Sequence, residues 1–171
     1  YQWPALQLQG LAPEALAVQA QTPVATLQAH EWLQAALAGV AQIFVVDNAA
    51  AGAIFVLALA VHSRWCALLA LLGSLAGAAT AVLWGAEPSQ VLHGLWGYSA
   101  ALTAPALGCV FLRPTPASLV WALLGAVCTT VVQGAAFSVL GPLGVPMFTA
   151  PFVLTTWVFL LAWRGMRASG P

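Results

Sequence analysis

Long apolar runs dominate the chain after its first thirty residues, and they are interrupted by short polar or Gly/Pro-containing stretches. The clearest runs cover 65–85 and 117–140. A helix that crosses a bilayer needs roughly 20 apolar residues, so each of these runs predicts one crossing. The runs are continuous instead of alternating with period two, which favours helices over barrel strands. The pattern therefore predicts an all-α, polytopic helical membrane protein.

Two further runs, 32–46 and 49–63, are each near 15 residues and are separated by Asp47 and Asn48. At 1.5 Å per residue neither is long enough to cross a bilayer comfortably alone. Asn and Asp are preferred N-cap residues, so either of these two polar residues could cap the second helix. We expect two short helices with a break between them.

The remaining apolar stretches are also broken. Residues 86–112 contain Gly94, Gly97, Pro105 and Gly108, and the sequence GPLGVP precedes the last run at 147–163. Irregular backbone at membrane depth is tolerated only inside protein or along a cavity. We predict about five transmembrane helices or partial crossings in all, plus a half-membrane pore helix.

Small and sulfur-containing residues inside the runs give two local expectations. Gly73 and Gly77 form a Gly-x-x-x-Gly pattern, which favours close packing of another helix. Cys66, Cys109 and Cys128 form no Cys-x-x-Cys pair, and we expect them to behave as small buried apolar side chains.

The chain divides into three parts. Residues 1–30 are rich in Gln and Pro and lack a long apolar run, which indicates a linker or surface segment. Residues 31–165 form a single transmembrane unit, and 166–171 a C-terminal tail. The sequence begins at Tyr1 instead of Met, so we expect either a removed leader or a piece of a longer chain.

Composition narrows the function further. Of 171 residues, 62% are hydrophobic and 5% are charged, against about a quarter charged in soluble domains. This excludes a soluble enzyme and a disordered chain, and four scattered Arg cannot form the basic face of a nucleic-acid binder. Arg is costly at a helix centre, so the four are expected at membrane boundaries. They are Arg64, Arg113, Arg164 and Arg167.

The sequence offers little for covalent chemistry. Gly97 and Ser99 fit the Gly-x-Ser pattern of rhomboid-type intramembrane proteases, but those enzymes need a later His base and no His follows Ser99. His30, His62 and His93 show neither the pairing expected in an ammonium channel nor a metal cluster, and nucleotide- and cofactor-binding motifs are absent. We expect no enzyme, cofactor or metal. Neutral polar residues remain, which suit a neutral solute.

Three segments resemble the bacterial urea transporters: FVVDNAAAGAIFVLAL at 44–59, GLWGYSAALTAPALG at 94–108 and GVPMFTAPFVLTTWVFLLA at 144–162. A repeat of that family reads roughly Gln-x-x-Phe-x-x-Asn-(Pro/Ala)-x-x-Gly, then Gly-Leu-x-Gly-(Phe/Tyr)-Asn-x-x-Leu, then Leu-Thr-x-Pro-Phe-x-x-x-(Thr/Ser)-Trp. The blocks occur in this order over residues 31–165, and they look most like the second, C-terminal repeat.

The resemblance implies passive, channel-type transport of urea through a multi-pass protein of the bacterial inner membrane. Family members carry two repeats of inverted topology with a pore between them, and they assemble as trimers with one pore per protomer. This sequence holds one repeat. Its implied partners are therefore urea, membrane lipid, and either a missing first repeat or a second half-chain, in a homotrimer of complete protomers.

Several site residues also follow from the resemblance. They are a polar group and an apolar wall near a slot (Gln42 and Ile43), two slot-forming positions (Val45 and Tyr98), a constriction (Leu102) and a central hydroxyl (Thr149). Val45 stands where the family has Phe, and Ser99 where it usually has Asn. These departures favour a wider slot, and they keep open a channel for other small amides, or a non-transporting remnant or structural membrane subunit.

Overall fold

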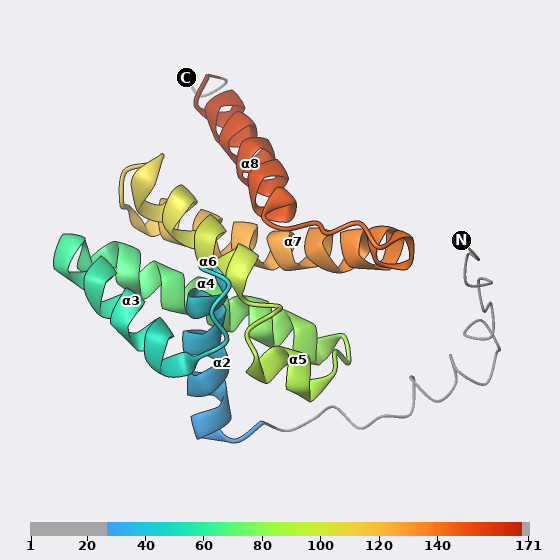
Figure 1. Cartoon of the computed structure of the whole chain (residues 1–171). Coiled ribbons are helices and arrows are strands. Elements are labelled where there is room, and N and C mark those ends of the chain that lie inside the picture. The colour runs from blue at the N-terminus through green and yellow to red at the C-terminus, as the bar shows by residue number, and fades with distance from the viewer. Residues whose placement is uncertain (1–26, 169–171) are drawn as a thin grey trace.

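The computed structural model describes residues 27–168, and these are almost entirely helical, with no strand among them (Figure 1). This confirms the all-α fold class; the residues predicted to form a linker lie outside the described part, except for 27–30. The elements are α2 (Ala29–Gln42), α3 (Ala49–His62), α4 (Arg64–Leu83), α5 (Pro88–Leu92), α6 (Tyr98–Pro105), the π-helix η2 (Ala106–Val110), α7 (Pro116–Leu140), the 3-10 helix η3 (Gly141–Leu143) and α8 (Ala150–Ala168).

Among residues 27–168, two helices are long and apolar enough to cross a membrane, α4 and α7 with its η3 extension. They match the two full crossings predicted from the sequence. Each has a hydroxyl cap at its start: Ser63 Oγ accepts from the amide of Cys66 at 3.3 Å, and Thr115 Oγ1 accepts from that of Ser118 at 3.1 Å. Such caps satisfy amides that have no partner within the helix.

The small residues of α4 let α6 approach closely, as the Gly-x-x-x-Gly pattern predicted. A Cβ added to Gly73 would lie 2.5 Å from the carbonyl oxygen of Ala100, and one added to Gly77 would lie 2.7 Å from that of Trp96. Both distances are too short for real Cβ contacts. The two backbones therefore pack at a separation that only glycine permits.

Small side chains fill the interior of this fold and large apolar side chains lie on its surface, which is the reverse of a soluble protein. Most buried apolar residues are alanines, whereas large apolar side chains cover the outer faces of α3, α7 and α8. Exposed examples are Leu57, Val61, Leu124, Trp157 and Leu161. Small residues at helix contacts and large apolar residues outside are typical of helices that pack in lipid.

The boundary of α2 differs from the predicted run at 32–46. The helix begins at Ala29, because Glu31 accepts a hydrogen bond of 2.6 Å from the Gln28 amide and so caps the start. It ends at Gln42, and three residues later Val45 takes a positive φ of 58°, which is incompatible with a right-handed helix. The break before α3 is therefore longer than the sequence indicated.

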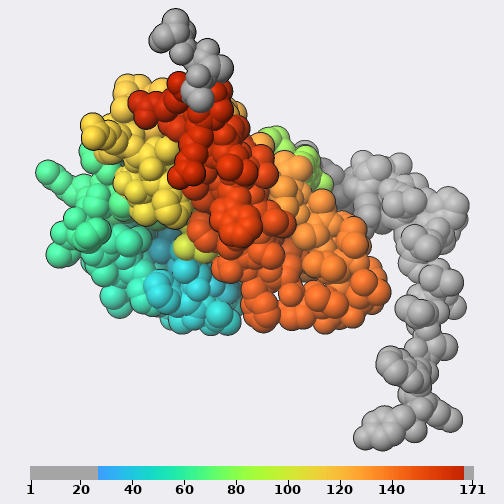
Figure 2. Space-filling view, turned by 90° about the horizontal axis from the view of Figure 1, so that it is seen from above, coloured from blue at the N-terminus to red at the C-terminus, as the bar shows by residue number. Residues whose placement is uncertain are grey.

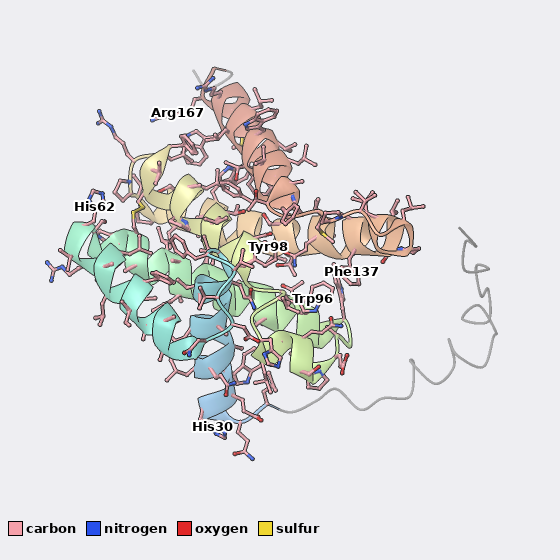
Figure 3. All side chains as sticks on the ribbon, viewed as in Figure 1. His30, His62, Trp96, Tyr98, Phe137 and Arg167 are labelled. Carbon is pink, nitrogen blue, oxygen red and sulfur yellow. A yellow bond between two sulfur atoms is a disulfide. The ribbon has the colours of Figure 1, made fainter. Side chains whose placement is uncertain are left out.

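The four Arg gather at one end of the molecule, which we call the arginine end. Arg64 opens α4, while Arg113, Arg164 and Arg167 line one surface hollow together. Figure 3 shows Arg167 and His62, the last residue of α3, towards the same side. Glu31 and Glu87 lie at the opposite end, where Trp32 and Ala86, their immediate neighbours in the chain, pack against one apolar cluster. Arginines therefore mark one end of the molecule, and Glu31 and Glu87 mark the other.

A disulfide between Cys66 and Cys109 joins α4 to η2 near the arginine end. This corrects the expectation that both cysteines act only as small apolar side chains. The two are 43 residues apart in the sequence, and their Cα atoms are 6.2 Å apart. Cys128 on α7 is a free thiol.

Candidate functional site

Three breaks in the helical backbone are linked in the middle of the molecule, and we call residues 43–48, 93–97 and 144–149 the central breaks. Each precedes a helix that runs from the middle towards the arginine end: α3, α6 continued by η2, and α8 (Figure 1). Viewed from above, α8 lies across the molecule beside α7 and the end of η2 (Figure 2).

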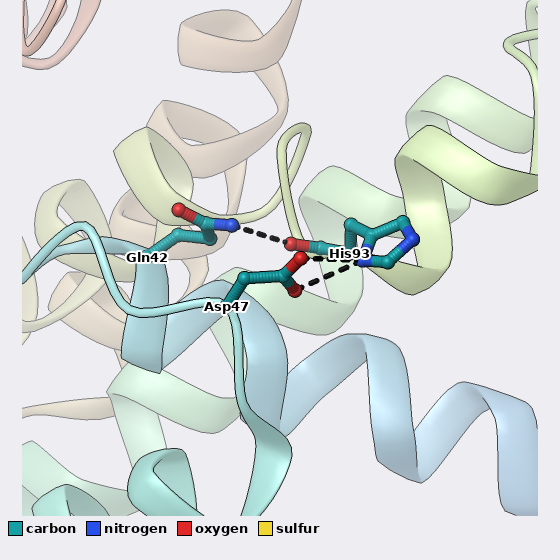
Figure 4. A network of polar contacts seen from close by, with 3 residues as sticks. All are labelled: Gln42, Asp47 and His93. Carbon is teal, nitrogen blue, oxygen red and sulfur yellow. Dashed lines mark hydrogen bonds and ion pairs between the residues drawn. The ribbon is translucent and has the colours of Figure 1, made fainter.

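The first two central breaks are joined through His93. The side-chain amide of Gln42 donates a hydrogen bond of 3.0 Å to the carbonyl oxygen of His93. The imidazole Nδ1 of the same His93 lies 2.9 Å and 2.8 Å from the two carboxylate oxygens of Asp47 (Figure 4). The last helical residue of α2, the loop before α3 and the loop before α6 are thus held together by polar contacts.

The second and third breaks are joined through Tyr98, the first residue of α6. Its hydroxyl donates a hydrogen bond of 2.6 Å to the carbonyl oxygen of Phe148. Phe148 takes a positive φ of 40°, and Thr149 follows it immediately before α8. Tyr98 therefore fixes the backbone next to the hydroxyl that the resemblance places at the pore centre.

Two residues in the central breaks hold an unfavourable backbone conformation. Val45 and Phe148 are the non-glycine residues with positive φ in the described part of the chain. A positive φ is a clear outlier for a β-branched or bulky residue. Such strain clusters at functional sites, where the surrounding structure must enforce it. The strain marks the first and third breaks as candidate parts of a site.

The predicted site residues lie in or beside the central breaks. Ile43 packs against a cluster that includes Val40 of α2 and Ala101 of α6. Val45 is 84% exposed, and Thr149 is exposed. Gln42, Tyr98 and Leu102 are partly buried. The structure thus places five of the positions in or next to the central breaks, and Leu102 one turn inside α6, while their roles towards a solute stay predictions.

Two neighbouring residues have structural roles. The Asn48 side chain accepts from the amides of Ala50 at 2.8 Å and Ala51 at 3.3 Å, so it caps α3 as predicted. Ser99 is fully buried, and its hydroxyl has no hydrogen-bond partner. Ser99 stands where the resemblance implies Asn, and its side chain is enclosed by protein. This departure therefore changes the packing inside the protein.

The sequence does not reveal the contacts that connect distant segments. One is the contact of Asp47 with His93. Another is made by Gln133 of α7, which donates a hydrogen bond of 2.6 Å to the carbonyl oxygen of Leu95. The available signal is that Gln133 is a polar residue within an apolar run, and that Asp47 and His93 interrupt apolar stretches. Within residues 27–168, no group of three or more His, Cys, Asp or Glu is placed to hold a metal ion.

Comparison with known proteins gives consistent matches. The family model described as urea transporter matches residues 3–164. Urea transporter 1 of Ovis aries and that of Capra hircus are each 34% identical to this chain over 135 residues, which cover 79% of this chain and 35% of the relative. Urea transporter 1 of Rattus norvegicus is 33% identical over 135 residues, with the same coverage of both chains. The chain therefore spans about 35% of the length of these relatives.

Proposed function

The chain belongs to the urea transporter family, and from that premise we propose that it provides part of a passive pathway for urea across a membrane. The family is one of integral membrane transporters and not of enzymes, as the sequence predicted. The observation that carries the proposal is the linkage of the central breaks, with three helices beginning where they meet.

Helix length supports a pathway at this place. α3 has 14 residues, which span about 21 Å, less than the roughly 30 Å of a bilayer core. When its C-terminus lies at the membrane boundary, its N-terminus lies inside the membrane. Helix starts and unwound segments at membrane depth are the recurring sites of solute recognition in transporters.

Neutral groups at the breaks suit urea, which is planar and carries N–H donors and one carbonyl acceptor. The Gln42 amide donates to His93 and leaves its own carbonyl oxygen to accept from a solute N–H. The Thr149 hydroxyl can accept or donate, and the ring of Tyr98 with Ile43 and Leu102 supplies apolar walls. These groups would replace the hydrogen bonds of urea to water one at a time. None of them would bind urea tightly, which favours passive conduction.

The position of Val45 favours a second candidate substrate class. Its side chain is exposed in a central break, and it is smaller than the Phe that the resemblance implies there. A wider opening would admit small neutral amides larger than urea. Val45→Phe is expected to reduce the flux of larger amides more than that of urea, and an unchanged selectivity would count against Val45 facing the solute.

The finer architecture is also proposed. One unit of about five transmembrane helices with a half-membrane pore helix would pair with a second unit of inverted topology, and complete protomers would assemble as a trimer in lipid. Positive residues favour the cytoplasmic side, so the arginine end would face the cytoplasm. A bacterial inner membrane stays a prediction, since the relatives compared above are mammalian.

Stopped-flow urea flux in liposomes containing the purified chain tests the proposal. Tyr98→Trp is expected to narrow the opening and slow the flux, because it enlarges a residue at the breaks. Leu161→Trp is the matched control, because Leu161 is exposed on α8 about three turns beyond the third break. Wild-type flux no greater than that of empty liposomes would reject transport by this chain alone and favour a structural subunit.

A further inference from the structure

A surface hollow of about 750 Å³ opens at the arginine end, between the loop that joins η2 to α7 and the last turns of α8. Arg167 is labelled near the C-terminal end of α8 in Figure 3. Two segments far apart in the chain thus bring three arginines to one place. The lining residues are Phe111, Leu112, Arg113, Thr115, Ala117, Trp163, Arg164 and Arg167.

No acidic side chain offsets these three positive charges. The acidic residues of the described part are Glu31, Asp47 and Glu87, and none of them lines the hollow. Asp47 contacts His93 in the central breaks, and the two Glu lie at the opposite end of the molecule. Within residues 27–168, none of the three arginines forms an ion pair. Because like charges around one hollow repel each other, the hollow favours an anion.

Arginine suits one kind of anion in particular. Its planar guanidinium can donate two parallel hydrogen bonds to a phosphate group, and it stays charged at any physiological pH. Arg113, Arg164 and Arg167 are all exposed. In the described part of the chain, their guanidinium groups donate no hydrogen bond to another residue. Their N–H groups are therefore open to a phosphate.

The hollow also has apolar surface, which a free phosphate ion would not use. Phe111 lines it and is 59% exposed. Trp163 lines it too, and its partly buried ring lies 5.9 Å from that of Trp121, measured between ring centroids. Trp is enriched at the membrane–water interface, where headgroups meet acyl chains. A phospholipid has a charged part and an apolar part, and it matches both parts of this lining.

We propose that this hollow binds the headgroup of an anionic phospholipid. The lipid phosphate would accept hydrogen bonds from Arg113, Arg164 and Arg167. The acyl chains would lie over Phe111 and Trp163. A lipid with a net negative charge fits better than a zwitterionic one, because the arginines would repel the ammonium group of the latter. The cytoplasmic leaflet is rich in anionic lipids, which agrees with the orientation proposed above for the arginine end.

This lipid site goes beyond urea transport and does not depend on it. None of the lining residues belongs to the central breaks. Lipid binding and urea flux are therefore separate properties of the same preparation, and each is measured directly. Loss of either one leaves the other proposal standing.

Native mass spectrometry of the full chain in a neutral detergent measures the affinity for two lipids with the same acyl chains. Dioleoylphosphatidylglycerol is anionic, and dioleoylphosphatidylcholine is zwitterionic. One basic residue strengthens the binding of anionic lipid by about fivefold, so phosphatidylglycerol is expected to bind more tightly by at least that factor. Equal affinities would overturn the proposal. Displacement of phosphatidylglycerol by an equal concentration of glycerol phosphate would also overturn it, because the site would then need no acyl chains.

Single variants locate the lipid. Arg113→Gln, Arg164→Gln and Arg167→Gln each remove one guanidinium and should each weaken phosphatidylglycerol binding by about fivefold. Arg64→Gln is the matched control, because Arg64 is an exposed arginine of the same end that does not line the hollow. An equal loss in Arg64→Gln would show attraction to net charge alone and would overturn the site. If one of the three variants does not fold, the other two still locate the lipid.

Discussion

The hydroxyl of Tyr98 donates to the carbonyl oxygen of Phe148 across 50 residues of sequence, and this bond ties the start of α6 to the break before α8. Phe148 has a positive φ, a conformation that needs support from its surroundings. One side chain therefore connects the predicted pathway to the strained segment.

Tyr98→Phe is expected to loosen the segment 144–149. The Phe148 carbonyl loses its donor, which lowers stability by about 0.5–1.5 kcal/mol. Hydrogen–deuterium exchange should rise in 144–149 while exchange in α4 stays unchanged. Ser138→Ala is the control, because it also removes one hydroxyl that bonds a carbonyl, yet it lies on α7 outside the breaks. Equal exchange of 144–149 in both variants would contradict the role of Tyr98.

Gly73→Ala is expected to separate α4 from α6. Its new Cβ would meet the Ala100 carbonyl oxygen at 2.5 Å, and the overpacking should cost about 1–3 kcal/mol. The midpoint of thermal unfolding in detergent measures the loss. At Gly165 on α8, an added Cβ meets nothing within 4 Å, so Gly165→Ala should leave the midpoint unchanged or raise it. A Gly73→Ala protein as stable as wild type would disprove the close contact.

Local features of this fold were predictable from sequence, because their causes lie within a few residues. Asn48 precedes an apolar run and caps it, and the Gly73 spacing indicates a packing face. The all-α class follows from run length alone. The C-terminal end of α2 was predicted less accurately than its existence. The positive φ of Val45, which ends the helical path, opposes the preference of a β-branched residue.

Contacts between distant segments were not predictable in the same way. Gln42 and His93 are 51 residues apart, and nothing in either local sequence specifies the other. The disulfide of Cys66 and Cys109 likewise depends on how α4 packs against η2. The resemblance to a family predicts a site region, because family motifs record tertiary neighbours that hydrophobic periodicity does not.

The disulfide predicts a thiol count that changes on reduction. The chain has three cysteines, so the denatured, unreduced protein should react at one thiol, Cys128, and at three after reduction. Cys66→Ser should lower thermal stability, since cross-links of this loop length contribute roughly 2–4 kcal/mol. Cys128→Ser is the control and should have no such effect. Three reactive thiols before reduction would contradict the pairing under the conditions used.

When the His93 imidazole is protonated, its contact with Asp47 is an ion pair, which is expected to contribute little to stability and measurably to coupling between the first two breaks. Both side chains are more than half exposed, at 56% and 57%, so the pair should be worth about 0.2–1 kcal/mol. A double-mutant cycle with Asp47→Asn, His93→Gln and the combination isolates this energy from other effects of each change. The Gln42 bond to the His93 backbone remains in every variant, so the breaks should stay together.

Salt dependence separates an ionic contact from simple proximity. Raising the ionic strength to 1 M shortens the screening length to about 3 Å, so the coupling energy of this exposed pair should fall. Glu87→Gln provides the control, because it removes an exposed carboxylate at the start of α5 and should show no coupling to His93→Gln. Strictly additive effects of Asp47→Asn and His93→Gln at low salt would show that the carboxylate and the imidazole lie close together without stabilising the join between the breaks.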